Sequence, residues 1–256
     1  MNRLRVETLT RRFDGLVAID DVSFAVPAEG VTAIIGPNGA GKTTLFNMIS
    51  GFLPPTQGRI FLEDSEVTGV APEQIAGRGL VRTFQLVQLF QTLTVLENVK
   101  VGRHVRTRSG LLAALTRPGW SRKEEAETER RARELIEFVG LDHADTRAAV
   151  LPYGQQRLLE VARALAAEPK LLLLDEPAAG LNHDETERLS RIIRRVAEGG
   201  MTVLLIEHDM KLVMNTADRL VVLNFGRKIA EGRPAEVQTN PDVIEAYLGG
   251  AEMLHA

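Results

Sequence analysis

One stretch of the chain decides its fold: Gly36-Pro37-Asn38-Gly39-Ala40-Gly41-Lys42-Thr43-Thr44. It fits the pattern G-x-x-x-x-G-K-[ST] of the phosphate-binding P-loop. The apolar run 31–35 before it predicts a buried strand, and a helical pattern over 43–50 follows it. This order of strand, loop and helix is the context that the motif requires.

Each residue type in the loop suits the binding of phosphate. Glycines allow positive φ angles, so that the backbone can curl into a nest of N–H groups. Those N–H groups and the following helix N-terminus attract anions. We expect Lys42 to reach the β- and γ-phosphates of a nucleotide and the Thr43 hydroxyl to ligate Mg²⁺. Residues 36–44 are therefore predicted to bind a nucleoside triphosphate.

Composition excludes several other classes of protein. The 256 residues are 44% hydrophobic and 25% charged, which is ordinary for a globular protein with a full core. A net charge of −3 does not indicate a nucleic-acid partner. There is no cysteine, and hence no disulfide framework or zinc finger. No stretch reaches the roughly 18–20 apolar residues of a membrane span, and residues 1–5 lack the apolar core of a signal peptide.

The periodicity predicts an α/β protein with a helical insertion. We expect the core to comprise 1–85 and 152–256 and the insertion to comprise 86–151. The insertion includes the start of the segment 151–155, LPYGQ. Strands are expected at 3–9, 22–26, 31–35, 58–62, 80–84, 171–174, 201–206, 220–224 and 228–231. Helices are expected at 43–50, 72–76, 92–101, 124–139, 155–167, 184–197 and 241–248.

Two carboxylates follow the apolar run 171–174. Such a buried strand delivers Asp175 to the P-loop, where it can hold Mg²⁺ directly or through water. Glu176 lies where the strand emerges and can polarise a water for attack on the γ-phosphate. The alternative, ordinary strand-end carboxylates, is weakened by the P-loop upstream.

Two more polar residues end predicted strands. His208 follows the run 201–206 and can hydrogen-bond the γ-phosphate and hold the attacking water. Gln85 follows the run 80–84 and can contact Mg²⁺ or water. Each of them, taken alone, is also compatible with an ordinary surface or loop position.

Together these features resemble the ATP-binding cassette (ABC) ATPases of transporters. The strings that carry the resemblance are GPNGAGKTT, VRTFQ, LPYGQQRLLEVARAL, LLLLDEP, AAGLN and LLIEHD, which span nearly the whole chain. The resemblance implies a P-loop ATPase with a RecA-like α/β core, an N-terminal antiparallel β subdomain and a helical subdomain. It also implies ATP and Mg²⁺ as the ligands.

Further site residues follow only from the resemblance. Phe13 is similar to the aromatic residue that stacks on adenine, although it also suits core packing at a strand end. Tyr153, Gly154 and Gln155 align with the signature LSGGQ, whose serine is replaced by Pro152. The resemblance implies that the serine hydroxyl contacts the γ-phosphate bound to a partner subunit, a contact that Pro152 does not supply. The segment 179–182 looks like the D-loop that crosses the dimer interface.

The strings YGQQ, RTFQ, IEHDMKLVM and NPDVIEAYLG are similar to one ATPase of branched-chain amino acid importers. This resemblance implies two membrane permeases, a second ABC ATPase and, indirectly, a solute-binding protein. A heterodimer of ATPases is expected, with a homodimer as the alternative. The resemblance also implies a peripheral position on the cytoplasmic face of the plasma (inner) membrane.

Other functions remain open at this point. An importer for urea or an aromatic acid, or a lipid exporter, uses the same chemistry. A soluble ABC protein of DNA repair or translation normally has a long coiled-coil insertion or two cassettes. A P-loop kinase or GTPase has no use for the signature segment. The basic run 103–123, with Trp120, suits either a solvated face or contact with lipid headgroups or an acidic partner.

Overall fold

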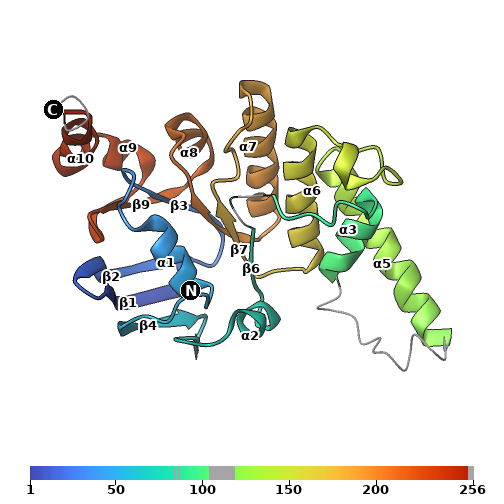
Figure 1. Cartoon of the computed structure of the whole chain (residues 1–256), viewed down its shortest axis with the longest axis horizontal. Helices are drawn as coiled ribbons and strands as arrows, with labels where there is room; N and C mark the ends of the chain where they lie inside the picture. The colour runs from blue at the N-terminus through green and yellow to red at the C-terminus, as the bar shows by residue number, and fades with distance from the viewer. Residues whose placement is uncertain (84, 86, 104–118, 253–256) are drawn as a thin grey trace. The chain divides into compact units, whose positions relative to one another are not determined.

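The computed structural model describes residues 1–83, 85, 87–103 and 119–252, which form two compact units (Figure 1). The first unit comprises Met1–Arg82 and Lys170–Ala256, and the second comprises Thr83–Pro169. The predicted insertion 86–151 lies within the second unit. That unit continues further, to Pro169, because its last helix packs on the helices before it.

A six-stranded sheet forms the centre of the first unit, in the order β10-β9-β3-β8-β7-β6. All neighbours are parallel except β10 and β9, which form a hairpin. The strands are β3 (Gly30–Ile35), β6 (Leu80–Arg82), β7 (Leu171–Asp175), β8 (Thr202–Ile206), β9 (Arg219–Asn224) and β10 (Arg227–Gly232). The unbroken apolar runs of β7 and β8 are typical of parallel strands that are buried on both faces.

A second sheet of the same unit is antiparallel, in the order β2-β1-β4-β5. Its strands are β1 (Asn2–Phe13), β2 (Leu16–Pro27), β4 (Gln57–Leu62) and β5 (Ser65–Glu66). Alternate residues of β1 such as Leu4 and Val6 are buried, whereas their neighbours are more exposed. This alternation is the pattern of a sheet with one face in the core.

Helix α1 (Lys42–Ile49) joins the two sheets into one hydrophobic core (Figure 1). Phe46 and Ile49 are fully buried, in a cluster that includes residues of β1, β2 and β4 from one sheet and of β7, β8 and β9 from the other. Leu171 and Leu173 belong to this cluster, so Leu172 and Leu174 point to the opposite face of the parallel sheet. The helix that begins in the P-loop is therefore anchored at its apolar side.

The remaining helices of the first unit are α2 (Pro72–Gly77), α7 (His183–Glu198), α8 (Met210–Thr216), α9 (Pro234–Gln238) and α10 (Pro241–Glu252). Helix α7 packs on β3 and β8. It begins with a capping box, in which Asn182 and Glu185 satisfy each other's backbone N–H groups. The side chain of Asp209 accepts hydrogen bonds from Lys211 and Leu212 and so caps α8.

The second unit is helical, as predicted. It contains α3 (Val95–Gly102), α5 (Gly119–Phe138), a 3₁₀ turn (Ala148–Val150) and α6 (Tyr153–Ala166). Helix α6 packs on both α3 and α5. Gly102 is required at the contact between α3 and α6, because a Cβ there would lie 2.0 Å from the Arg163 carbonyl oxygen.

The predicted helices and strands are confirmed, apart from their ends. Strand β6 stops at Arg82 rather than at residue 84, which lies outside the described residues, and β1 and β2 are longer than expected. Four short elements were not predicted, namely β5, the 3₁₀ turn Ala148–Val150, α8 and α9. With two to seven residues each, they are too short to show a periodic pattern. Most of the basic run, residues 104–118, also lies outside the described residues.

Candidate functional site

The predicted catalytic residues of the first unit lie at one edge of the parallel sheet. The P-loop follows β3, Asp175 ends β7, and His208 comes two residues after β8. Since β3, β7 and β8 are parallel neighbours, their carboxyl ends meet at the same edge. Ile206 pairs with Ile34 on one side and with Asp175 on the other. This edge is where open α/β sheets bind their ligands.

The backbone of the P-loop requires glycine at positions 36 and 41. Gly36 has φ 152°, and a Cβ there would lie 2.1 Å from the Leu223 carbonyl oxygen. Gly41 has φ 98°, and a Cβ there would lie 2.7 Å from the Ala18 carbonyl oxygen. Both positions combine a left-handed backbone with close contact to another strand, which excludes larger residues.

The turn between β9 and β10 holds the P-loop in place through backbone hydrogen bonds. The Gly226 N–H donates to the Ala40 carbonyl at 3.0 Å, and the Gly226 carbonyl accepts from the Asp20 N–H at 2.9 Å. Gly226 thus connects the P-loop with β2. Such backbone contacts hold the loop in shape without using the side chains that face solvent, which include those of Asn38 and Thr43.

Lys42 lies inside the loop that it follows. Its Nζ donates to the carbonyl oxygens of Gly36 at 2.7 Å and Pro37 at 2.9 Å, and the residue is only 7% exposed. Burial lowers the pKa of the Lys42 ammonium, while the negative charge of Glu176 acts in the opposite direction. The ammonium is therefore already held at the loop where anionic phosphates are expected.

Asp175 and Thr43 offer oxygen ligands that fit Mg²⁺. The Asp175 side chain is nearly buried, and its Oδ2 accepts from Arg82 Nη2 at 2.6 Å. Within the described residues, no group of three or more acidic, histidine or cysteine side chains could hold a metal by itself. Mg²⁺ is usually bound through one or two protein ligands together with substrate phosphates, and Asp175 and Thr43 supply ligands of this kind.

Glu176 has an unusual backbone conformation. Its φ of 45° is in the left-handed region, and its N–H donates to the Ile206 carbonyl at 2.9 Å. Its Oε2 lies 3.6 Å from His208 Nδ1, with the histidine side chain 59% exposed. Strained backbone of this kind is common at functional sites, where surrounding contacts impose it. The structure thus brings together Glu176 and His208, both of which were predicted to act on the γ-phosphate.

One buried carboxylate of this region was not predicted. Glu207 is fully buried, and its side chain accepts hydrogen bonds from the N–H groups of Ala178, His208 and Asp209 at 2.8, 3.1 and 3.4 Å. It therefore connects the loop after Glu176 with the loop that carries His208. The only signal in the sequence was an acidic residue directly after an apolar strand.

The stability contribution of Glu207 is expected to depend on pH. Burial raises the pKa of its carboxyl above the ordinary value of 4.5, although the three N–H groups oppose this shift. Because the pKa is raised in the folded state, the contribution of the protonated Glu207 side chain to stability is complete below pH 4.5. This contribution is lost as the pH rises through the pKa of Glu207 in the folded protein. We expect the wild type to lose stability relative to Glu207→Gln, which stays neutral, as the pH rises above 4.5.

Urea unfolding of both proteins at several pH values measures this difference. A constant difference between pH 4.5 and pH 8 would contradict it. Glu207→Ala removes all three acceptor contacts and is expected to cost about 1–3 kcal/mol, because the buried Ala178 N–H loses its partner.

Phe13 lies at the tip of the hairpin formed by β1 and β2, opposite Leu16. It is 39% exposed, and the Arg11 guanidinium lies 4.5 Å from its ring centre. A few residues further along β2, Ala18 contacts Gly41 of the P-loop. Phe13 is thus an accessible aromatic ring rather than a core residue, as stacking on a base requires.

The other predicted site residues, Gln85 and Tyr153 to Gln155, belong to the second unit. The carbonyl oxygen of Gln85 accepts a hydrogen bond from Arg157, whose guanidinium also lies 5.4 Å from the Tyr153 ring centre. Tyr153 and Gly154 begin α6, and Pro152 is its N-cap residue with no side-chain hydrogen bond. Helix α6 therefore starts with the N–H groups of the signature segment, the part suited to an anion.

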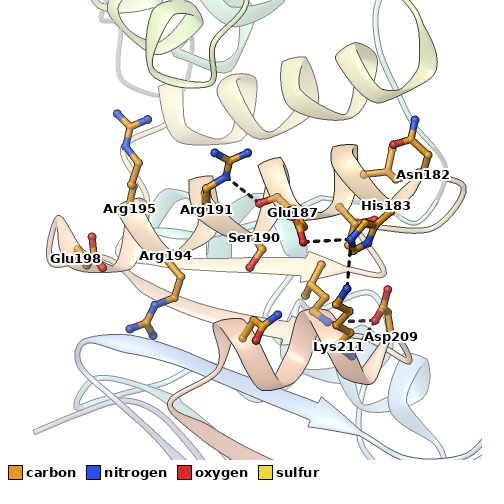
Figure 2. Close-up of a pocket in the computed structure, with 14 residues that line it drawn as sticks. Asn182, His183, Glu187, Ser190, Arg191, Arg194, Arg195, Glu198, Asp209 and Lys211 are labelled. Carbon is orange, nitrogen blue, oxygen red and sulfur yellow. Dashed lines mark hydrogen bonds and ion pairs between the residues drawn. The ribbon is translucent and has the colours of Figure 1, made fainter.

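A pocket of about 740 Å³ lies between α7 and α8, outside the phosphate site (Figure 2). His183 Nε2 lies 3.2 Å from Glu187 Oε1 and 3.2 Å from Lys211 Nζ at one end of it. Asn182 and Asp209, the cap residues of the two helices, also line this end. The pocket thus borders the ends of the predicted D-loop and of the His208 loop, but no P-loop residue lines it.

Comparison with known proteins identifies the family of the chain. The family model described as "ABC transporter" matches residues 19–179, and one described as "Branched-chain amino acid ATP-binding cassette transporter" matches residues 227–252. The chain is 46% identical to the high-affinity branched-chain amino acid transport ATP-binding protein LivG of Escherichia coli. It is 47% identical to the corresponding protein BraF of Pseudomonas aeruginosa. Each alignment covers 97% of this chain and 98% of the relative.

A solved structure shows the same similarity at the level of the fold. The crystal structure of the ADP conformation of an ATP-binding cassette of an ABC transporter superposes with a TM-score of 0.84. It is 38% identical in sequence, and the match covers 97% of this chain and 99% of that one. The predicted P-loop ATPase fold is thereby confirmed, and the chain belongs to the ABC transporter family of ATP-binding proteins.

Proposed function

We propose that this chain is the ATP-hydrolysing subunit of an importer for branched-chain amino acids. The observation that carries the proposal is the meeting of the P-loop, Asp175, Glu176 and His208 at one sheet edge. The transported solute rests on the 46–47% identity to LivG and BraF and on the family match at residues 227–252.

The residues of the first unit have separate roles in the binding and hydrolysis of ATP. The N–H groups of the P-loop and the Lys42 ammonium bind the β- and γ-phosphates, while Phe13 stacks on adenine. Thr43 and Asp175 hold Mg²⁺, which neutralises charge on the phosphate oxygens when bound. Glu176 accepts a proton from a water as the water oxygen attacks the γ-phosphorus and the bond to the β-phosphate oxygen breaks. His208 hydrogen-bonds the γ-phosphate.

The signature segment acts on a second ATPase subunit. One ATP lies between the P-loop of one subunit and residues 153–155 of the other, so that ATP favours the closed dimer. Hydrolysis removes the γ-phosphate bridge, and the dimer opens. Pro152 supplies no hydroxyl to this interface, so the segment acts through Gly154, Gln155 and the N-terminus of α6. Gln85 contacts Mg²⁺ or water and couples the closure to a permease.

The expected assembly contains two permeases and a second, non-identical ABC ATPase, with a solute-binding protein outside the membrane. None of the helices described, including α5 with its 20 residues, is apolar enough over a sufficient length to span a bilayer. Because its relatives are transport ATP-binding proteins, we expect the chain to reach the membrane through permeases, on the cytoplasmic face.

Affinity capture of the tagged chain from detergent-solubilised native membranes tests this function. Two polytopic permeases and a second ATPase with an LSGGQ signature are expected to co-purify. Separate uptake measurements with labelled leucine, urea and an aromatic acid in vesicles that contain the captured complex then test the solute. Capture of soluble partners or nucleic acid only would overturn the transport assignment, and uptake of urea alone would overturn the solute.

A further inference from the structure

Arg82 connects three elements of the phosphate site. It ends β6, and its guanidinium donates from Nη2 to Asp175 Oδ2 at 2.6 Å. From Nη1 it donates to Asn47 Oδ1 and Ser50 Oγ, both at 2.8 Å. Asn47 belongs to α1, the helix that begins at Lys42, and Ser50 is its C-cap residue. One side chain thus joins the P-loop helix to the carboxylate at the end of β7.

The guanidinium is buried and fixed from several sides. The Arg82 side chain is 6% exposed and that of Asp175 is 5% exposed. Two aromatic rings flank the guanidinium, with the Phe46 ring centre at 5.6 Å and the Phe52 ring centre at 5.8 Å. A planar guanidinium can donate in two directions and lie against rings at the same time, which a lysine ammonium cannot do.

The two carboxylate oxygens of Asp175 differ in their hydrogen bonds. Oδ2 faces Arg82, and no residue that the structure describes donates to Oδ1. Because the Arg82 contact fixes the rotation of the carboxylate, Oδ1 keeps one orientation and remains available to a cation. In metal sites, partners that orient a ligand in this way are worth about 10- to 100-fold in metal affinity or activity.

We propose that Arg82 is a positioning residue that orients Asp175 for Mg²⁺ and ties this orientation to the P-loop helix. The proposal rests on the proposed role of Asp175 as an Mg²⁺ ligand. A purely structural ion pair is the alternative, and buried pairs of that kind are weak evidence for any gain in stability. The two interpretations differ in whether the loss of Arg82 changes the Mg²⁺ requirement of nucleotide binding.

The test measures ATP affinity by calorimetry at a series of Mg²⁺ concentrations and in EDTA. All proteins carry Glu176→Gln, so that ATP is not consumed. Arg82→Met is expected to raise the Mg²⁺ concentration for half-maximal tightening of ATP binding by about 10- to 100-fold. ATP affinity in EDTA is expected to change less than about threefold, because the P-loop contacts remain. Arg82→Lys keeps the positive charge but loses the planar set of guanidinium donors. Its Mg²⁺ concentration for half-maximal tightening is expected to lie between the values for the protein with Arg82 and for Arg82→Met.

Arg3→Met is the matched control. Arg3 is also partly buried and ion-paired, with Glu63, but it contacts Thr202 at the amino end of β8, the opposite edge of the sheet. Its replacement is expected to leave the Mg²⁺ requirement unchanged. If Arg82→Met fails to fold in thermal unfolding, Arg82→Lys carries the test alone.

Two results would overturn the inference. An unchanged Mg²⁺ requirement in folded Arg82 variants would make the contact purely structural. An equal loss of ATP affinity in EDTA would show that Arg82 acts through α1 rather than through Asp175. Asp175→Asn separates this failure from that of the proposed metal site, because an unchanged Mg²⁺ requirement in Asp175→Asn would reject the metal role of Asp175 itself.

Discussion

Glu176→Gln is expected to lower the rate of ATP hydrolysis by about 10²- to 10⁴-fold, the usual contribution of a positioned general base. The glutamine has nearly the same shape, so the left-handed backbone at residue 176 and its hydrogen bond to the Ile206 carbonyl are retained. ATP affinity is therefore expected to stay within a few-fold of the wild-type value. Phosphate release measures the rate, and calorimetry measures the affinity.

Glu231→Gln is the matched control for this experiment. The Glu231 side chain is 17% exposed, close to the 19% of Glu176, and it pairs with Arg219 and Lys228 on the hairpin of β9 and β10. This variant is expected to hydrolyse ATP at the wild-type rate. Turnover near the wild-type rate in Glu176→Gln would instead remove Glu176 from its role and leave His208 as the candidate base.

Lys42→Ala is expected to weaken ATP binding by about 2–5 kcal/mol, or roughly 30- to 5,000-fold, the cost of truncating one partner of a buried charge contact. The Lys42 ammonium is already inside the loop, bound to the Gly36 and Pro37 carbonyls, so no rearrangement is needed to bring it to phosphate. ATP affinity measured by calorimetry tests this expectation.

Lys170→Ala serves as the control for Lys42→Ala. Lys170 directly precedes β7, at the end of the strand opposite to Asp175, and its Nζ pairs with Glu63 at 2.8 Å. It is expected to bind ATP like the wild type. Micromolar ATP affinity retained by a folded Lys42→Ala would show that backbone N–H groups alone hold the phosphates.

Local patterns were enough to predict much of the site. The P-loop is nine consecutive residues whose glycines and lysine act within one turn of backbone, so its shape follows from local rules. Asp175, Glu176 and His208 were predicted from their positions after apolar runs, and the common edge at which parallel strands end is what brings them together. The apolar runs of β7 and β8 were long enough to identify these strands without any knowledge of their neighbours.

Tertiary structure alone decided which residues support the site. Arg82 reaches Asp175 across 93 residues of sequence, and Glu207 reaches the Ala178 N–H across 29. The contact of Gly226 with Ala40 likewise depends on β9 lying next to β3. Hydrophobic periodicity identifies a strand and its buried faces but does not specify the order of strands in a sheet. These partners were therefore undetermined until packing placed β6 beside β7 and β9 beside β3.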